Sequence, residues 1–139
     1  SLRLASELDR RLQADGRRLP VLIQVNSSGE ASKFGLAPAE VPAFARELKA
    51  LDALDVRGLM TLALPSPDPD AVASCFDRVV AVQRALRDDD ALDGDYAELS
   101  MGMSGDFELA IAHGATCVRV GTAIFGARPP ASPPHADQR

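Results

Sequence analysis

Two segments in the last third of the chain combine glycine, serine and threonine in a way that suits phosphate binding. The first is Leu99–Asp106, Leu-Ser-Met-Gly-Met-Ser-Gly-Asp, and the second is Val118–Ala123, Val-Arg-Val-Gly-Thr-Ala. Each is a short apolar run that breaks into small polar residues, where a strand gives way to a helix. Such turns leave backbone N–H groups free at a helix N-terminus, where they bind phosphate oxygens. Together the segments predict a cradle for a phosphorylated ligand, with hydroxyls from one and an arginine beside a Gly-Thr turn from the other.

The hydropathy pattern predicts four strands and four helices that position these segments. Nearly continuous apolar runs indicate buried strands, and apolar residues at helical spacing indicate amphipathic helices. The expected strands cover residues 21–25, 56–62, 96–99 and 117–120, and the expected helices lie within residues 4–15, 38–51, 72–86 and 107–112. Their alternating order predicts an α/β fold with a parallel sheet and right-handed crossovers, which brings every loop that follows a strand to one rim.

The composition indicates one soluble globular domain over residues 1–128. The 139-residue chain is 46% apolar and 25% charged, with a formal net charge of -5. Its basic residues form no run interleaved with aromatic ones and no apolar run is long enough to cross a bilayer, so neither nucleic-acid nor membrane binding is expected. Cys75 and Cys117 suggest neither a disulfide scaffold nor a metal site, and the absence of a signal peptide favours the cytoplasm. The proline-rich residues 129–139 are expected to form a disordered tail.

Four strands are half the number in a closed (β/α)8 barrel, which takes about 250 residues. Composition and periodicity leave two arrangements open. One is an open, doubly wound sheet. The other is half of a barrel, whose remaining half comes from upstream chain or from self-association, because bare strand edges favour pairing. The chain begins at Ser1 instead of methionine, and we expect it to be the C-terminal portion of a longer protein.

Five segments resemble the pyridoxal phosphate homeostasis protein family. They are Val21–Asn26, Ser32–Gly35, Val56–Met60, Leu99–Asp106 and Val118–Arg128, and they occur in the order and at the spacing of that family. The resemblance implies the fold of the alanine racemase N-terminal barrel without its second domain, here the C-terminal half of a TIM barrel. It also implies a carrier and buffer of pyridoxal 5′-phosphate in the cytoplasm, with vitamin B6-dependent apoenzymes as partners and no catalytic residue of its own.

The resemblance assigns roles to residues in the two glycine-rich segments. Ser100 donates its hydroxyl to the phosphate of the cofactor, and the backbone amides of Gly121 and Thr122 complete the cradle. Arg119 faces the pyridine nitrogen. A guanidinium is permanently charged and cannot accept a proton, so it keeps that nitrogen unprotonated and makes the cofactor a weaker electron sink. Such a site suits binding, delivery or racemase-like chemistry more than transamination.

The lysines depart from the family pattern. In that family, the lysine that binds the cofactor covalently lies on the first strand of the barrel, a part without a counterpart here. The chain has only Lys33 and Lys49. Lys33 follows the first visible strand and can approach the cofactor, whereas Lys49 lies on the polar side of a helix. Met101 and Met103 are expected to line the surroundings of the ring. We therefore expect weak, non-covalent binding of the cofactor, or none.

Other interpretations use the same residues. An amino acid racemase needs a lysine base and a second acid–base group, commonly a tyrosine, but Tyr96, the only tyrosine, begins its expected strand and so lies at the opposite rim. Another phosphate-binding barrel enzyme, or an open flavodoxin-like module, would use the same turns for a different ligand. Ser104 is interpreted as a cap of the helix that follows it, and Glu98 or Asp106 is an alternative partner for Arg119.

Overall fold

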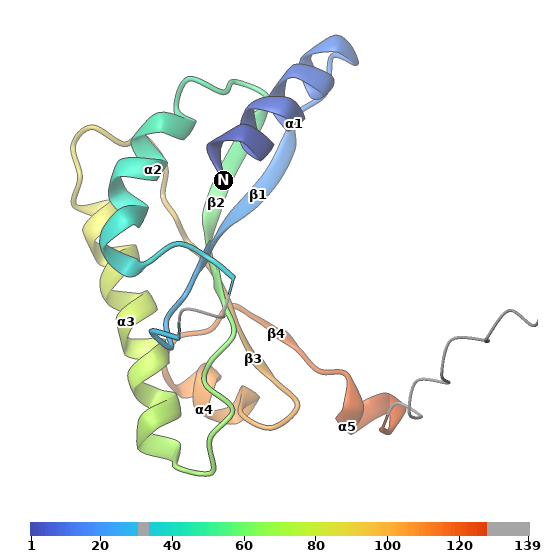
Figure 1. Cartoon of the computed structure of the whole chain (residues 1–139), viewed down its shortest axis with the longest axis vertical. Coiled ribbons are helices and arrows are strands. Elements are labelled where there is room, and N and C mark those ends of the chain that lie inside the picture. The colour runs from blue at the N-terminus through green and yellow to red at the C-terminus, as the bar shows by residue number, and fades with distance from the viewer. Residues whose placement is uncertain (31–33, 128–139) are drawn as a thin grey trace, which may run out of the picture.

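Four parallel strands form one sheet in the computed structural model, which describes residues 1–30 and 34–127. The strands are β1 (Leu19–Val25), β2 (Leu54–Thr61), β3 (Glu98–Met103) and β4 (Cys117–Arg119), and they lie side by side in chain order (Figure 1). All three neighbouring pairs are parallel. The predicted parallel β/α sheet is therefore confirmed.

Helices connect these strands. They are α1 (Leu2–Ala14), α2 (Val41–Leu48), α3 (Pro69–Arg87), α4 (Phe107–Ala112) and α5 (Thr122–Phe125), with a 3-10 turn, η1 (Pro38–Glu40), ahead of α2. Pro42 and Pro69 lie in the first turns of α2 and α3, where their missing N–H groups cost no helical hydrogen bond. Asp68 caps α3 by accepting a hydrogen bond from the Asp70 amide at 3.0 Å. Gly114, with φ 93°, follows the end of α4 and takes the left-handed conformation that glycine favours there.

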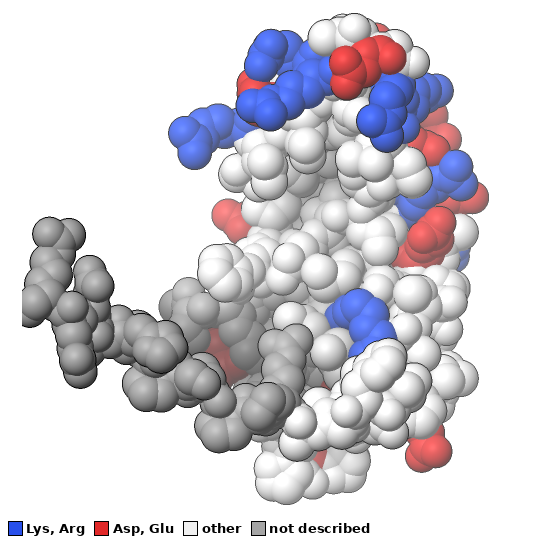
Figure 2. Space-filling model, turned by 90° about the vertical axis from the view of Figure 1, so that its right-hand side faces the viewer, with Lys and Arg blue, Asp and Glu red and all other residues white. Residues whose placement is uncertain are grey.

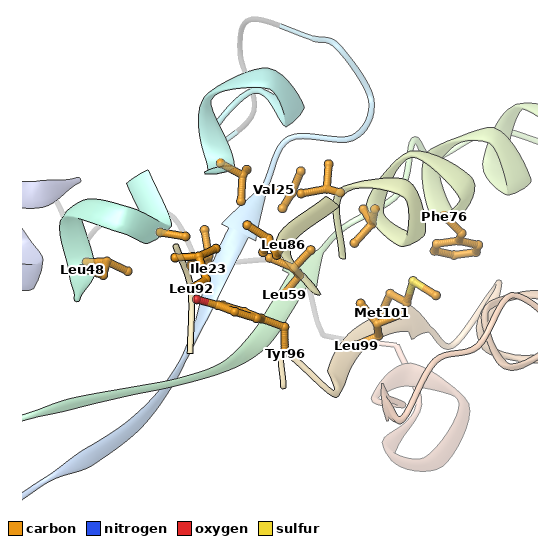
Figure 3. Packing of buried hydrophobic residues seen from close by; sticks show 14 of the residues in the cluster. Ile23, Val25, Leu48, Leu59, Phe76, Leu86, Leu92, Tyr96, Leu99 and Met101 are labelled. Carbon is orange, nitrogen blue, oxygen red and sulfur yellow. The ribbon is translucent and has the colours of Figure 1, made fainter. Parts of the chain in front are cut away.

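Helices α1 to α4 pack on the same face of the sheet. Successive helices contact one another, and a single core cluster joins all four to the strands. Strand alternation sends Ile23, Leu59 and Met101 toward the helices, where Figure 3 shows Phe76 and Leu86 among their neighbours. A doubly wound sheet needs helices on both faces. The open flavodoxin-like arrangement is therefore not the fold of this chain.

The opposite face of the sheet carries Leu22, Met60 and Ser100. Leu22 and Met60 are half-buried there, and the described helices α1 to α4 all lie on the other side. Figure 2 views the molecule from the side away from α2 and α3. The middle of this surface is largely uncharged, while Lys and Arg gather at the end near α1. One layer of helices outside and an uncharged sheet face inside is the arrangement of a barrel wall.

Strand β3 differs from the predicted strand of residues 96–99, because it starts later and continues further. Tyr96 lies in the preceding loop with φ 45°, and its carbonyl accepts a hydrogen bond from the Gln83 amide at 2.6 Å. At the other end, Gly102 has φ 97° and lies in an irregularity of the pairing with β4. This bulge lets the strand continue through a glycine that alone suggests a turn. Ser100 is therefore inside the strand and does not end it.

Some predictions concern residues outside the described ranges, 1–30 and 34–127. Lys33 and the tail of residues 129–139 are not among the described residues, so the domain division at residue 128 stays a prediction. Within the described ranges, no helix combines the length and the apolar character needed to cross a membrane.

Gly58 on β2 provides a test of the sheet. A Cβ atom at Gly58 would lie 1.9 Å from the backbone oxygen of Glu98 on β3, which the strand cannot move aside without breaking its pairing. We expect Gly58→Ala to lower the free energy of unfolding by about 1–3 kcal/mol or more, measured by urea denaturation. Gly105→Ala is the control, because a Cβ there meets nothing within 4 Å, and its effect should stay within about 0.5 kcal/mol. Equal stability of the two variants would contradict this packing.

Candidate functional site

The side chain of Arg119 crosses the carboxyl end of the sheet. From the last residue of β4, its Nη1 donates to Ser100 Oγ on β3 at 2.5 Å, and its Nη2 donates to the backbone oxygen of Thr61 on β2 at 2.8 Å. The guanidinium thus spans three strands, although β2 and β4 are not neighbours. Both partners are neutral, so they hold the group in place without compensating its charge.

The two carboxylates considered as partners of Arg119 do not take that role. Across residues 1–30 and 34–127, the Arg119 guanidinium forms no ion pair with a described acidic residue. Asp106 instead accepts a hydrogen bond from the Met103 amide at 2.6 Å, which shapes the loop after β3. Glu98 lies at the amino end of β3, away from the rim that Arg119 occupies. The positive charge of Arg119 therefore remains available to a ligand.

The role expected for Ser100 changes with its position. Ser100 is only 5% exposed, and its hydroxyl oxygen accepts the hydrogen bond from Arg119. Because the residue lies within β3 and its hydroxyl is engaged by the guanidinium, it is placed to orient Arg119 and not to join the turn amides. The sequence interpretation put this hydroxyl at the end of a strand because the predicted strand covered only residues 96–99.

Ser104 is the serine that meets the turn amides. Its Oγ accepts hydrogen bonds from the amides of Gly121 at 3.0 Å and Ala123 at 3.2 Å. Two N–H groups at the start of α5 thus converge on one oxygen, as they would on an oxygen of a phosphate. The interpretation of Ser104 as the cap of α4 is wrong, since Asp106 occupies that position. The signal that could have identified Ser104 is its place just after β3, on the same rim as Gly121.

The other predicted site residues divide between rim and core. Thr122 begins α5 directly after Gly121, and its side chain is exposed. Met103 is 41% exposed and lies on the rim, whereas Met101 is fully buried among the core residues that face the helices. Strand alternation alone would put both methionines on one face, and the bulge at Gly102 is what separates them. Met101 therefore does not line a site at the rim.

A cavity of about 640 Å³ opens between the loops that follow β2 and β3. Leu62, Pro65, Met103 and Phe107 provide apolar walls, and Ser104 provides a hydroxyl at its border. Small-molecule sites commonly combine an apolar lining with a few placed polar groups. The cavity thus adds room for an apolar ring beside the amides that converge on Ser104.

Titratable side chains that suggested other chemistry lie away from this rim. Tyr96 precedes the amino end of β3, and its burial raises the pKa of its phenol, with Asp93 contributing. Lys49 forms an ion pair with Asp93 at 2.8 Å at the same end of the molecule. His113 contacts Asp77 at 2.8 Å between α4 and α3. In the described part of the chain, no group of three or more His, Cys, Asp or Glu side chains is arranged to hold a metal ion.

The fold and the rim define a parallel β/α protein of the barrel class, with a cluster of amide and guanidinium donors at the carboxyl ends of its strands. The chain belongs to the alanine racemase N-terminal domain family, whose family model matches residues 1–129. It is 46% identical over 127 residues to the pyridoxal phosphate homeostasis protein of Pseudomonas aeruginosa, an alignment that covers 91% of this chain and 53% of that relative. The resemblance expected from the sequence is therefore confirmed.

Solved structures agree with this assignment. An unknown protein from Bifidobacterium adolescentis superimposes with a TM-score of 0.85 at 41% identity, over 90% of this chain and 50% of its own. PipY of Synechococcus elongatus with pyridoxal phosphate bound gives a TM-score of 0.73 at 33% identity, over 91% of this chain and 57% of its own. The chain spans about half the length of the curated relatives it matches.

The contact between Ser104 and the α5 amides generates a prediction. Ser104→Ala removes the shared acceptor, so hydrogen exchange of the Gly121 and Ala123 amides should accelerate by about fivefold, the equivalent of one lost hydrogen bond. Exchange measured by NMR, residue by residue, provides the test. Ser66→Ala is the matched control, because Ser66 accepts the Asp68 amide in a different loop and should leave both exchange rates unchanged. Unaltered exchange in Ser104→Ala would show that the contact is not formed in solution.

Proposed function

We propose that this chain binds pyridoxal 5′-phosphate and contributes to storing and delivering it. One observation carries the proposal: at a single rim, two amides converge on Ser104 while the Arg119 guanidinium, among residues 1–30 and 34–127, is held by neutral partners. The names of relatives support the choice of ligand. The Pseudomonas aeruginosa relative is a pyridoxal phosphate homeostasis protein, and one PipY structure holds pyridoxal phosphate.

The phosphate group is proposed to bind at the start of α5. The amides of Gly121 and Ala123 already share one oxygen acceptor, and the Thr122 amide lies between them in the chain. An incoming phosphate oxygen would take the place that the Ser104 hydroxyl holds, and that hydroxyl would then be free to donate to another phosphate oxygen. Ser104 thus joins Gly121 and Thr122 in the proposed cradle.

Arg119 is proposed to meet the ring nitrogen of the ligand, as the family resemblance implies. Its guanidinium donates hydrogen bonds and stays charged, so it favours the neutral form of that nitrogen. Ser100 holds the guanidinium through the 2.5 Å hydrogen bond and so acts on the ligand through Arg119. When bound, pyridoxal phosphate supplies an aldehyde and an electron-withdrawing ring. A neutral ring nitrogen weakens that withdrawal, which suits a protein that carries the cofactor.

Binding by this chain is proposed to be non-covalent. Lys49 forms an ion pair with Asp93 at the end of the sheet where the strands begin, opposite the rim that carries Arg119. A contact of Lys33 with the cofactor stays a prediction, since Lys33 lies outside the described residues. Delivery to vitamin B6-dependent apoenzymes in the cytoplasm is the proposed role of the whole protein. The free cysteines Cys75 and Cys117 are compatible with that reducing compartment.

A racemase activity is not proposed. Within this chain the second acid–base group would be Tyr96, which is only 4% exposed and precedes the amino end of β3, whereas Arg119 lies at the carboxyl end. A tyrosine there cannot exchange a proton with a ligand held at the opposite rim.

NMR titration of the chain with pyridoxal phosphate tests the proposed function, since it also detects weak binding. We expect the Gly121, Thr122 and Ala123 amide signals to shift. Arg119→Gln should lower the affinity by about tenfold or more, because a hydrogen bond from a charged group is lost, and Ser104→Ala by about fivefold.

The control for this titration is Arg84→Gln, which removes an exposed arginine from α3 and should leave the affinity unchanged. Pyridoxal, which lacks the phosphate group, should bind more weakly and should leave the NMR signals of the α5 amides unshifted. The proposed function is refuted if the wild-type chain shows no shifts at these amides, or if Arg119→Gln and Arg84→Gln bind alike.

A further inference from the structure

The residue that holds Arg119 from β2, Thr61, is itself fixed by a buried polar network. Thr61 is the last residue of β2 and is fully buried. Its carbonyl oxygen accepts the hydrogen bond from Arg119 Nη2 at 2.8 Å, while its hydroxyl donates to the backbone oxygen of Val25 on β1 at 2.8 Å. Thr61 therefore connects the guanidinium to the neighbouring strand on its other side.

Ser27 completes the fixation of Thr61. The two hydroxyl oxygens lie 2.8 Å apart, and Ser27 is only 1% exposed. Because the Thr61 proton is directed at Val25, the hydroxyl of Ser27 must be the donor in this pair. The Ser27 carbonyl in turn accepts a hydrogen bond from Arg78 of α3 at 2.6 Å. A continuous series of contacts thus leads from α3 through the end of β1 and β2 to Arg119.

This network holds Thr61 at the point where the regular pairing between β2 and β3 ends. The recorded β2–β3 register ends with Met60 opposite Ser100, so Thr61 lies beyond the last pair on that side. On the other side, Thr61 pairs with Val25 at the end of β1. Beyond the last pair with β3, the Thr61 carbonyl accepts from Arg119, and both the pairing with Val25 and the two hydroxyl contacts hold the residue that carries it. A long arginine side chain loses rotamer freedom when it is held, so a pre-set acceptor favours one guanidinium position.

We propose that Thr61 and Ser27 act as a positioning pair for Arg119, setting where its guanidinium meets a ligand and how strongly it opposes protonation of that ligand's ring nitrogen. The part about the ligand rests on the proposed function. The part about Arg119 rests only on the contacts described above. Neither Thr61 nor Ser27 is assigned a contact with the ligand.

The first measurement follows Arg119 without a ligand. In wild-type chain labelled with ¹⁵N, the Nη protons of Arg119 should give separate, slowly exchanging signals at low temperature, because both Nη atoms are hydrogen-bonded. Thr61→Val, which keeps the shape but removes the hydroxyl, should average these signals, and Ser27→Ala should do so in part. Thr61→Ser restores the hydroxyl and should restore the separate signals.

Thr116→Val is the matched control. Thr116 also bonds across neighbouring strands through its hydroxyl, accepting the Leu99 amide at 2.8 Å, but it precedes the amino end of β4. Removing this hydroxyl should reduce stability in a similar way while leaving the Arg119 signals as in wild type. If Thr61→Val leaves those signals unchanged, or Thr116→Val averages them equally, the positioning pair is refuted.

The second measurement uses pyridoxal phosphate labelled with ¹⁵N in its ring. The ring-nitrogen signal should indicate the neutral form with wild-type chain, move toward the Arg119→Gln value in Thr61→Val, and return in Thr61→Ser. Affinity for Thr61→Val should fall by about fivefold, the equivalent of one hydrogen bond. If Thr61→Val averages the Arg119 Nη signals but the ring-nitrogen signal is the same with wild type and with Arg119→Gln, the positioning pair stands and the proposed role of Arg119 fails. If the ring nitrogen responds to Arg119→Gln but not to Thr61→Val, the positioning pair fails.

Discussion

The structure of the rim depends on one guanidinium that bridges three parallel strands. Arg119 reaches from β4 over β3 to β2, with Ser100 and the Thr61 carbonyl as its partners. These two neutral acceptors orient the guanidinium of Arg119 without compensating its charge. An oriented charge interacts more strongly with a ligand than a charge on a flexible side chain. Strand register therefore determines the chemistry of the rim, because a shift of one residue would turn Ser100 to the opposite face.

The two faces of the sheet have different roles. One face builds the core, and the other carries residues proposed to act on a ligand. Leu59, Leu99 and Met101 turn toward α1 to α4 and build the core, while Ser100 and Arg119 belong to the uncovered side. A single helix layer with a free inner face is the construction of a barrel wall, and the chain covers about half the length of its curated relatives. Residues on the free face can thus serve a ligand without disturbing the core.

Sequence reasoning predicted that the two glycine-rich segments meet at one rim, but not which of their residues make the contact. The glycine-rich segments after β3 and β4 do come together, since Ser104 bonds the Gly121 and Ala123 amides. Ser100, which was expected to share a phosphate with those amides, instead bonds Arg119 from within β3, because the strand continues through a bulge at Gly102. Thr61 gave no signal at all, because a threonine at the end of an apolar run looks like any other strand residue.

Local patterns alone determined the four strands, the helices α1 to α4 and their order, because periodicity and turn residues act over a few neighbours. They also brought the two glycine-rich segments to one rim. Family-specific segments also identified the relatives. Only the tertiary structure decided which serine meets the amides, which methionine is buried and which atoms hold Arg119. These features depend on the bulge in β3 and on contacts between residues 17 to 58 positions apart in the chain, which short-range patterns do not encode.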